Sequence, residues 1–151
     1  MAPVDYRTSR PEPANQPALG RAADDARAIA GGAYYTAACV DAAADVVHLS
    51  LAGAPQSIID RLNARHPGTY VISNDAAHPL SELLRVQRAL RGALHTAGVS
   101  VQIFRSYPSS DGYLEVGIEG HDVHDAQSAL DSMFGTGIIK VFGGAQRGTA
   151  F

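Results

Sequence analysis

The sequence contains one strand–turn–strand–helix–strand pattern twice, at residues 33–74 and again at 99–144. In both copies the second strand ends at a glycine, and a predicted helix with one central leucine follows (Leu62 or Leu130). An internal repeat constrains the architecture more than any local motif, because both copies must bury equivalent faces. The turn and second strand are Asp41–Asp45 and Val46–Gly53 in the first copy, and Ser109–Gly112 and Tyr113–Gly120 in the second.

The alternation within these strands predicts a sheet with one buried face and one hydrated face. In the second copy, Leu114, Val116 and Ile118 alternate with polar or small residues, among them Glu115 and Glu119. This period of two is typical of a half-buried strand. We therefore predict an α+β fold: an antiparallel-rich sheet with helices on one face, built from two ββαβ-like units. From residue 69 onward the predicted order is βαββαβ, that of a ferredoxin-like split unit.

The length of the chain and its proline pattern predict one domain with two extensions. Residues 1–20 hold four prolines among polar residues, which indicates a disordered arm. A short helix over residues 21–30 and the two units, joined by a helix at 79–97, make one α+β domain at 21–142. We expect 151 residues to form a single core. Residues 143–151 are predicted to be a flexible tail.

Charge and cysteine content exclude several classes of protein. Twelve Lys and Arg against fifteen Asp and Glu give a net charge of −3, so we expect no nucleic-acid partner. The sequence has no apolar run that could span a bilayer and no signal peptide. We expect a cytoplasmic protein as written, or a secreted one if a leader has been removed. The single cysteine, Cys39, excludes an intramolecular disulfide and is predicted to be a buried structural thiol. The alanine- and arginine-rich composition is actinobacterial in character.

Two groups of polar residues are candidates for catalytic or metal sites. His121 and His124 flank Asp122, which we interpret as a helix N-cap rather than as part of a metal site. Asp75 and His78, with Ser81 and Glu82 beyond them, offer an acid, a base and a hydroxyl, but helix-entrance chemistry explains them as well. We therefore predict no catalytic residues, no metal and no cofactor.

The second unit resembles the C-terminal part of the prodomains of alpha-lytic and streptogrisin-like serine proteases. The residues that match are 107–119, 126–134 and 137–142, and residues 39–51 match more loosely in the first unit. The resemblance implies a domain that extends the sheet of a protease, lays its C-terminal tail in the active-site cleft, and acts as folding chaperone and inhibitor. The strands at 99–107 and 113–118 would then form the contact surface. No protease follows Phe151, so we expect a domain that acts in trans.

The sequence therefore predicts a non-enzymatic protein-binding domain that engages a serine protease, or a second copy of itself, by β-augmentation. A ferredoxin-like small-molecule sensor that dimerises is one alternative, and a structural subunit or adaptor of a larger assembly is another. An enzyme built on Asp75 and His78, or on the two histidines near Asp122, is the least favoured. The predicted partner-binding residues are Glu115, Glu119, Gly143, Gly144, Gln146, Arg147 and Phe151.

Overall fold

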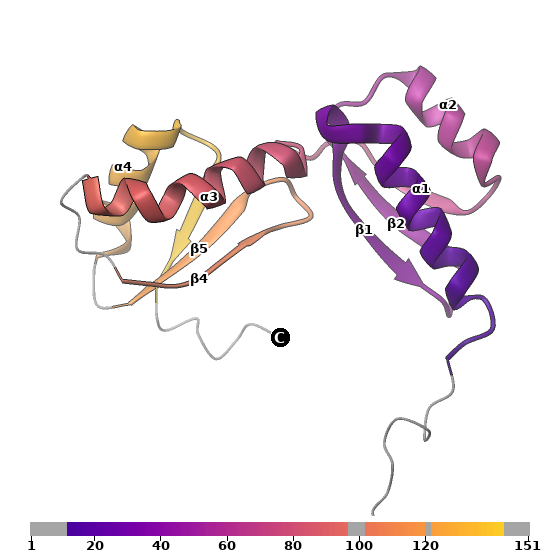
Figure 1. The fold of residues 1–151 in the computed structure, drawn as a ribbon, viewed down its shortest axis with the longest axis horizontal. Coiled ribbons are helices and arrows are strands. Elements are labelled where there is room, and N and C mark those ends of the chain that lie inside the picture. The colour runs from indigo at the N-terminus through magenta and orange to yellow at the C-terminus, as the bar shows by residue number, and fades with distance from the viewer. Residues whose placement is uncertain (1–11, 97–101, 120–121, 144–151) are drawn as a thin grey trace, which may run out of the picture.

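A computed structural model describes residues 12–96, 102–119 and 122–143 (Figure 1). These residues form two units, and each has the order helix, strand, strand, helix, strand. The first unit contains α1 (Gln16–Tyr34), β1 (Tyr35–Asp41), β2 (Val46–Leu51), α2 (Gln56–Arg65) and β3 (Tyr70–Ser73). The second contains α3 (Leu80–Thr96), β4 (Gln102–Pro108), β5 (Leu114–Glu119), α4 (Val123–Phe134) and β6 (Ile139–Phe142).

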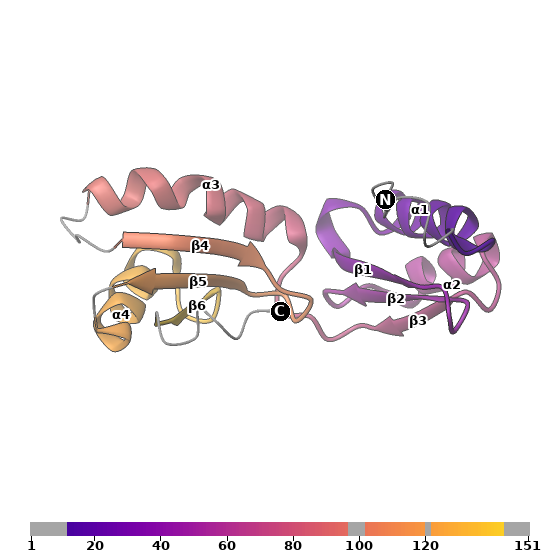
Figure 2. The same ribbon diagram turned by 90° about the horizontal axis from the view of Figure 1, so that it is seen from below.

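Each unit has its own three-stranded sheet, which Figure 2 shows as two separate groups of arrows. The strand orders are β1-β2-β3 and β4-β5-β6, with one antiparallel pair followed by one parallel pair. The predicted α+β class with two ββαβ units is confirmed. The last six elements do follow the order βαββαβ, but β3 pairs with β2, so this order runs across two sheets.

The repeat extends to the register of the strands. Cys39 lies opposite His48 in the first sheet, and Tyr107 lies opposite Glu115 in the second. Both antiparallel pairs also carry a register shift at the same place, between Tyr35 and Ala37 in β1 and between Ile103 and Arg105 in β4. A bulge is a specific local feature of a strand pair. Because this shift recurs at the same position, the two units correspond residue by residue in their antiparallel strand pairs and not only in the order of their elements.

The apolar side chains divide between the units, so the expectation of a single core is wrong. Both helices of a unit cover the same face of its sheet, because each helix contributes to the same cluster as the central strand. Each sheet has only one apolar face, and its own two helices are enough to cover it. Leu62 of α2 and Leu130 of α4 are buried at equivalent points. The second core consists of Leu83, Val86, Leu90, Leu114, Val116, Ile118, Ala126, Leu130 and Ile139.

Helix α1 is longer than predicted, and it begins inside the segment that we assigned to the disordered arm. Pro17 lies in the first turn, where its missing N–H is tolerated. Gly31 has a φ of 67° and interrupts the helix, so the helical backbone does break after residue 30, where the predicted helix ends. The buried face of α1 is mostly alanine, which is a weak apolar signal, and consists of Leu19, Ala22, Ala26 and Ala30. These residues are spaced along α1 as the buried leucines and valine are along α3.

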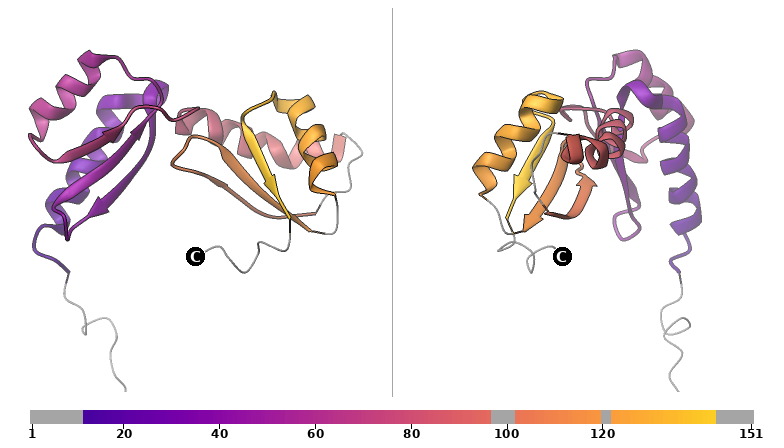
Figure 3. Two further views of the ribbon diagram at one scale, coloured as in Figure 1. Left: turned by 180° about the vertical axis from the view of Figure 1, so that it is seen from behind. Right: turned by 60° about the vertical axis from the view of Figure 1, so that its left-hand side comes forward.

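A short joint, residues 74–79, connects the units and is bonded to both of them. The hydroxyl of Thr36, a side chain that is only 2% exposed, donates to the carbonyl of His78 at 2.9 Å. On the other side, the amide of Ala77 donates to the carbonyl of Asp111 at 2.9 Å. The two units meet at this joint as the arms of an arch, with the helices outside and the strands inside (Figures 1 and 3).

Candidate functional site

The helix-free faces of the two sheets are the parts of the strands that the cores do not use. Because the registers match, each outward position of the first sheet has a counterpart in the second. The first-sheet surface is made of small or polar side chains with one exposed valine: Ala37, Cys39, His48, Ser50, Val71 and Ser73. The counterparts in the second sheet are, in the same order, Arg105, Tyr107, Glu115, Gly117, Lys140 and Phe142.

The second sheet carries aromatic and cationic side chains that contact one another across the strands. The rings of Tyr107 on β4 and Phe142 on β6 lie 6.4 Å apart between centroids. The guanidinium of Arg105 lies 5.7 Å from the centroid of the Tyr107 ring. Lys140, the only lysine of the chain, places its Nζ 3.8 Å from the centroid of Tyr113, the residue before β5. We call Arg105, Tyr107, Tyr113, Glu115, Lys140 and Phe142 the second-sheet surface.

Glu115 holds the centre of this surface. It lies on β5 between Tyr107 and Lys140, which are its partners on the two neighbouring strands. A hydrogen bond between the Tyr107 hydroxyl and the Glu115 carboxylate raises the pKa of Tyr107 above its usual value, because the carboxylate favours the protonated phenol. The predicted contact residue Glu115 is therefore already engaged with a neighbour on the same surface.

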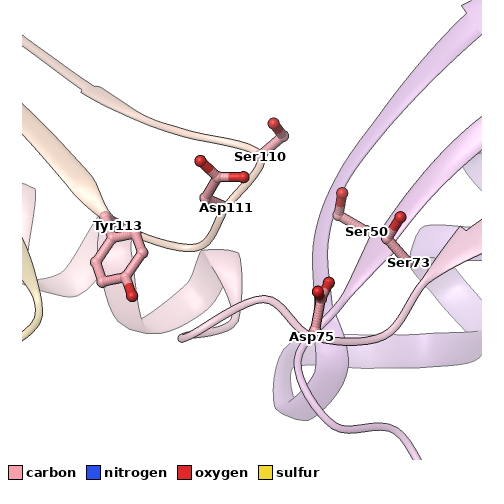
Figure 4. A pocket seen from close by; sticks show the side chains of 6 residues that line it. All are labelled: Ser50, Ser73, Asp75, Ser110, Asp111 and Tyr113. Carbon is pink, nitrogen blue, oxygen red and sulfur yellow. The ribbon is translucent and has the colours of Figure 1, made fainter.

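A polar pocket of about 440 Å³ lies where the two helix-free faces meet. Figure 4 shows Asp75 from the joint and Asp111 from the β4–β5 turn on opposite sides of the opening. The other lining residues are serines from both units and the phenol of Tyr113. This pocket connects the first-sheet surface, through Ser50 and Ser73, to the second-sheet surface, through Tyr113.

Cys39 is exposed, which corrects the prediction of a buried thiol. The side chains of β1 alternate, and Cys39 points to the helix-free face, where it lies opposite His48. His48 Nε2 is 3.3 Å from a carboxylate oxygen of Asp41. The pKa of Asp41 is lowered first by the amide of Ala44, which hydrogen-bonds to the carboxylate, and then by His48.

Of the candidate group Asp75, His78, Ser81 and Glu82, the structure brings only His78 and Glu82 together. The ring of His78 lies between Glu82 and Gly137: Nδ1 is 3.3 Å from the Glu82 carboxylate and Nε2 is 2.9 Å from the Gly137 carbonyl. The hydroxyl of Ser81 donates to the carbonyl of Gly32 in α1. Asp75 instead faces the pocket.

The predicted helix cap at Asp122 is confirmed. Its carboxylate accepts hydrogen bonds from the amides of His124 and Asp125, at 2.7 and 3.3 Å. His124 is exposed on the first turn of α4, and His121 lies outside the described residues. Within residues 12–96, 102–119 and 122–143, no three His, Cys, Asp or Glu side chains come together in a way that could hold a metal ion.

The predicted partner-binding residues fall into two groups. Glu115 and Glu119 lie on β5, and Gly143 directly follows β6. Gly144, Gln146, Arg147 and Phe151 lie outside the described residues. Arg105 lies within the strand at 99–107 that the resemblance gave as contact surface, whereas Lys140 and Phe142 were not predicted. Their signal was the same period-two alternation that identified Glu115, but β6 is only four residues long and offers too few repeats to display it.

None of the helices in the described ranges combines the length and the apolar composition that a bilayer crossing requires. The sequence matches no known family model, no curated protein and no solved structure.

Proposed function

We propose that this chain is a non-enzymatic binding protein that holds a protein partner on the inner side of the arch, against the second-sheet surface. The observation that carries the proposal is the contrast between the two units. The inward positions of the central strands β2 and β5 carry the same kind of side chain, buried and aliphatic, such as Leu49 and Val116 or Leu51 and Ile118. The outward positions of the two units differ at every one of the six compared sites. The aromatic and cationic set of the second sheet is therefore not needed for the fold.

The chemistry of the second-sheet surface favours a protein partner. Protein interfaces are enriched in tyrosine, phenylalanine and arginine, and a few such residues contribute most of the binding energy. Tyr107, Phe142 and Arg105 offer this combination on one rigid sheet. The first-sheet surface has no tyrosine, phenylalanine or arginine among its six compared positions.

Strand addition at β6 gives the proposal its geometry. Among the described strands, β6 (Ile139–Phe142) pairs with β5 alone, and its second edge is bonded to a side chain of α4: Gln127 accepts from the amide of Val141 at 2.8 Å and donates to the carbonyl of Ile139 at 2.7 Å. An added strand would take over these two backbone groups by displacing Gln127. Lys140 and Phe142 project from this strand on the helix-free side, beside the path of an incoming strand. The resemblance to protease prodomains names a serine protease as the partner and residues 143–151, which follow β6 directly, as the segment for its active-site cleft.

Affinity capture tests this function. The full chain, a Lys140→Glu/Phe142→Ser variant and a chain ending at Phe142 are immobilised and exposed to lysate and culture fluid of the source organism. Arg61→Glu is the matched control, because Arg61 is an exposed cation on α2. We expect a serine protease to bind the full chain and the control, and to bind the double variant at least about tenfold more weakly, as loss of an interface anchor predicts.

The purified protease then separates the two parts of the proposal. Inhibition by the full chain that is lost on truncation after Phe142 supports the role of residues 143–151. Binding that is the same for all four proteins would place the interface away from the second-sheet surface and refute the proposal. Size-exclusion chromatography with light scattering identifies a second copy as the partner if the full chain, but not the double variant, is dimeric.

The pocket between the units supports a second candidate, a small-molecule sensor. Its volume of about 440 Å³ lies within the range of ligand sites, and its lining of carboxylates and hydroxyls suits a polar cation. A thermal-shift screen of small amines against the parent and an Asp75→Asn/Asp111→Asn variant tests it. Stabilisation of the parent alone would favour the sensor, and absence of any shift would refute it.

A further inference from the structure

We infer that the outer edge of β3 (Tyr70–Ser73), the β3 edge, is a surface for a second copy of this chain, whose own β3 pairs with it in the antiparallel sense. This goes beyond the proposed function, because it concerns the first unit and not the second-sheet surface. Figure 2 shows β3 at the side of the first sheet, where β2 is its one neighbouring strand among the described residues. The edge of a sheet presents unpaired N–H and C=O groups and is a template for another strand.

The backbone groups that face away from β2 belong to Tyr70 and Ile72. The amide of Val47 donates to the carbonyl of Thr69 at 2.9 Å, and along a parallel pair every second residue bonds to the neighbouring strand. Val71 is therefore bonded to β2, whereas Tyr70 and Ile72 direct their amides and carbonyls outward. Within the described ranges, no side chain forms a hydrogen bond with these outward groups.

The second unit closes the equivalent edge with a side chain. Gln127 of α4 accepts from the amide of Val141 and donates to the carbonyl of Ile139. Counted from the equivalent buried leucines of α2 and α4, the counterpart of Gln127 is Ile59, which packs against the first core and cannot form such bonds. Helix α4 also lies close along β6, whereas α2 makes no comparable approach to β3. The first unit therefore lacks the contact that closes the edge of β6.

The side chains at the centres of the two edge strands differ in the same sense. The counterpart of Val71 is Lys140, and a lysine on an edge strand opposes pairing with an identical strand, because two like charges would then meet. Residues 69–73 carry no charged side chain. The β3 edge therefore lacks both protections that β6 has, the bonded glutamine and the lysine.

The other two edge strands have cover from the rest of the chain. On β4, the side-chain amide of Gln87 from α3 donates to the carbonyl and to the hydroxyl oxygen of Ser106, at 3.0 and 3.1 Å. On β1, α1 and α3 both pack against the strand. Over the part of the chain that the structure describes, the β3 edge is therefore the least covered.

A second copy fits the β3 edge because this edge is complementary to itself. In an antiparallel pair centred on Val71, Tyr70 lies opposite the second copy's Ile72, and the two residues exchange both of their backbone bonds. Val71 then lies opposite the second copy's Val71, in the position where side chains approach most closely. Val71 is 48% exposed, and no other large apolar side chain in the described ranges is classed as exposed. The pairing thus covers it with the identical side chain, as a two-fold interface requires.

Cysteine cross-linking tests the pairing and its register. Val71→Cys and Ser73→Cys are each made in a Cys39→Ser background and oxidised. Opposed residues in this position have Cα atoms about 4.5 Å apart, within reach of a disulfide. Ser73 is the matched control, because it shares the strand and the face, but the two copies of Ser73 would lie about 13 Å apart along the strands. We expect Val71→Cys to form a covalent dimer at least about tenfold faster, since a disulfide cannot bridge the longer distance.

Sedimentation equilibrium measures the association of the unmodified chain. We expect its mass to rise from one copy toward two between about 5 µM and about 500 µM, because a short strand pair buries little area and such interfaces are weak. Val71→Lys and Ile59→Gln, which give the β3 edge the lysine and the glutamine of β6, should stay monomeric. Ala37→Lys, on the same face of the sheet but on β1, should behave like the parent. Circular dichroism checks that each variant is folded.

Three outcomes would overturn the inference: a parent that stays monomeric over this range, a dimer that persists in Val71→Lys, or equal cross-linking of the two cysteine variants. Hydrogen exchange adds a further check, since an Ile72 amide that is protected in the monomer would mean that a segment of the same chain covers the β3 edge. Lys140→Glu/Phe142→Ser separates this dimer from the proposed function. We expect that variant to dimerise like the parent, and loss of its dimer with retention in Val71→Lys would place the second copy on the second-sheet surface instead.

Discussion

Replacing Gly112 by alanine tests whether the joint between the units is tightly packed. Gly112 has a φ of 85°, and a Cβ at this position would lie 2.6 Å from the backbone nitrogens of both Ala77 and His78. The left-handed backbone costs an alanine about 1–2 kcal/mol. Overpacking against backbone atoms, which cannot rotate away, adds about 1–3 kcal/mol. We expect Gly112→Ala to lower the free energy of unfolding by about 2–5 kcal/mol.

Gly53 supplies the control for this experiment. Its φ is 63°, but no atom lies within 4 Å of a Cβ built on it, so Gly53→Ala should cost only the backbone part, about 1–2 kcal/mol. Urea denaturation with linear extrapolation measures both variants. The amide of Ala77, which is bonded to the Asp111 carbonyl, should also exchange faster in Gly112→Ala. Equal losses of stability in the two variants would refute the close packing of the joint.

Three further predictions follow from the cores and from the titrating groups. Leu62→Ala and Leu130→Ala should each lower the free energy of unfolding by about 2–5 kcal/mol in urea denaturation. Because the two leucines lie in separate cores, the double variant should lose the sum of the two single losses to within about 0.5 kcal/mol. The pKa of Asp25 is lowered chiefly by the hydrogen bond from His66, so an NMR titration should find the pKa of Asp25 raised in His66→Gln. The stability that this pair contributes is present at pH values above 3.8, the ordinary pKa of the carboxyl, and is lost as the pH falls through the lowered pKa. Burial raises the pKa of Tyr70 to about 12, so ultraviolet titration should detect its ionisation well above that of an ordinary tyrosine, and stability should fall as the pH rises from about 10 to about 12.

The strands and the repeat could be predicted because their signal is local. Val47, Leu49 and Leu51 alternate with polar residues over a single strand, and the second unit repeats the pattern. Helix α1 was underestimated because its buried face is made of alanines, which an amphipathic pattern barely distinguishes from the exposed ones. The split into two sheets was missed for another reason. The pairing of β3 with β2 depends on which distant strand β3 meets, and the residues of β3 themselves carry no pattern that identifies this partner.

The candidate site was partly predictable for the same reasons. Glu115 was identified from the alternation of β5, and its place on the helix-free face is as expected. The contacts of Tyr107 with Phe142 and of Lys140 with Tyr113 join residues about thirty positions apart, which are adjacent only once β4, β5 and β6 are paired. The exposure of Cys39 follows from its phase within β1, where the apolar pattern is too weak to reveal which side faces the core.

The alternation along the strands divides the residues of this chain into two sets: inward residues, which form the cores, and outward residues, which form the helix-free faces. Substitutions of inward residues change the stability of the fold, and substitutions of outward residues change the chemistry of the exposed sheet surface. Because each unit has its own core and its own sheet, the outward residues of one unit can be substituted while the other unit is left unchanged. Transferring Tyr107, Lys140 and Phe142 to their counterparts Cys39, Val71 and Ser73 would convert an arch with two unlike inner walls into one with two similar walls, on an unchanged scaffold.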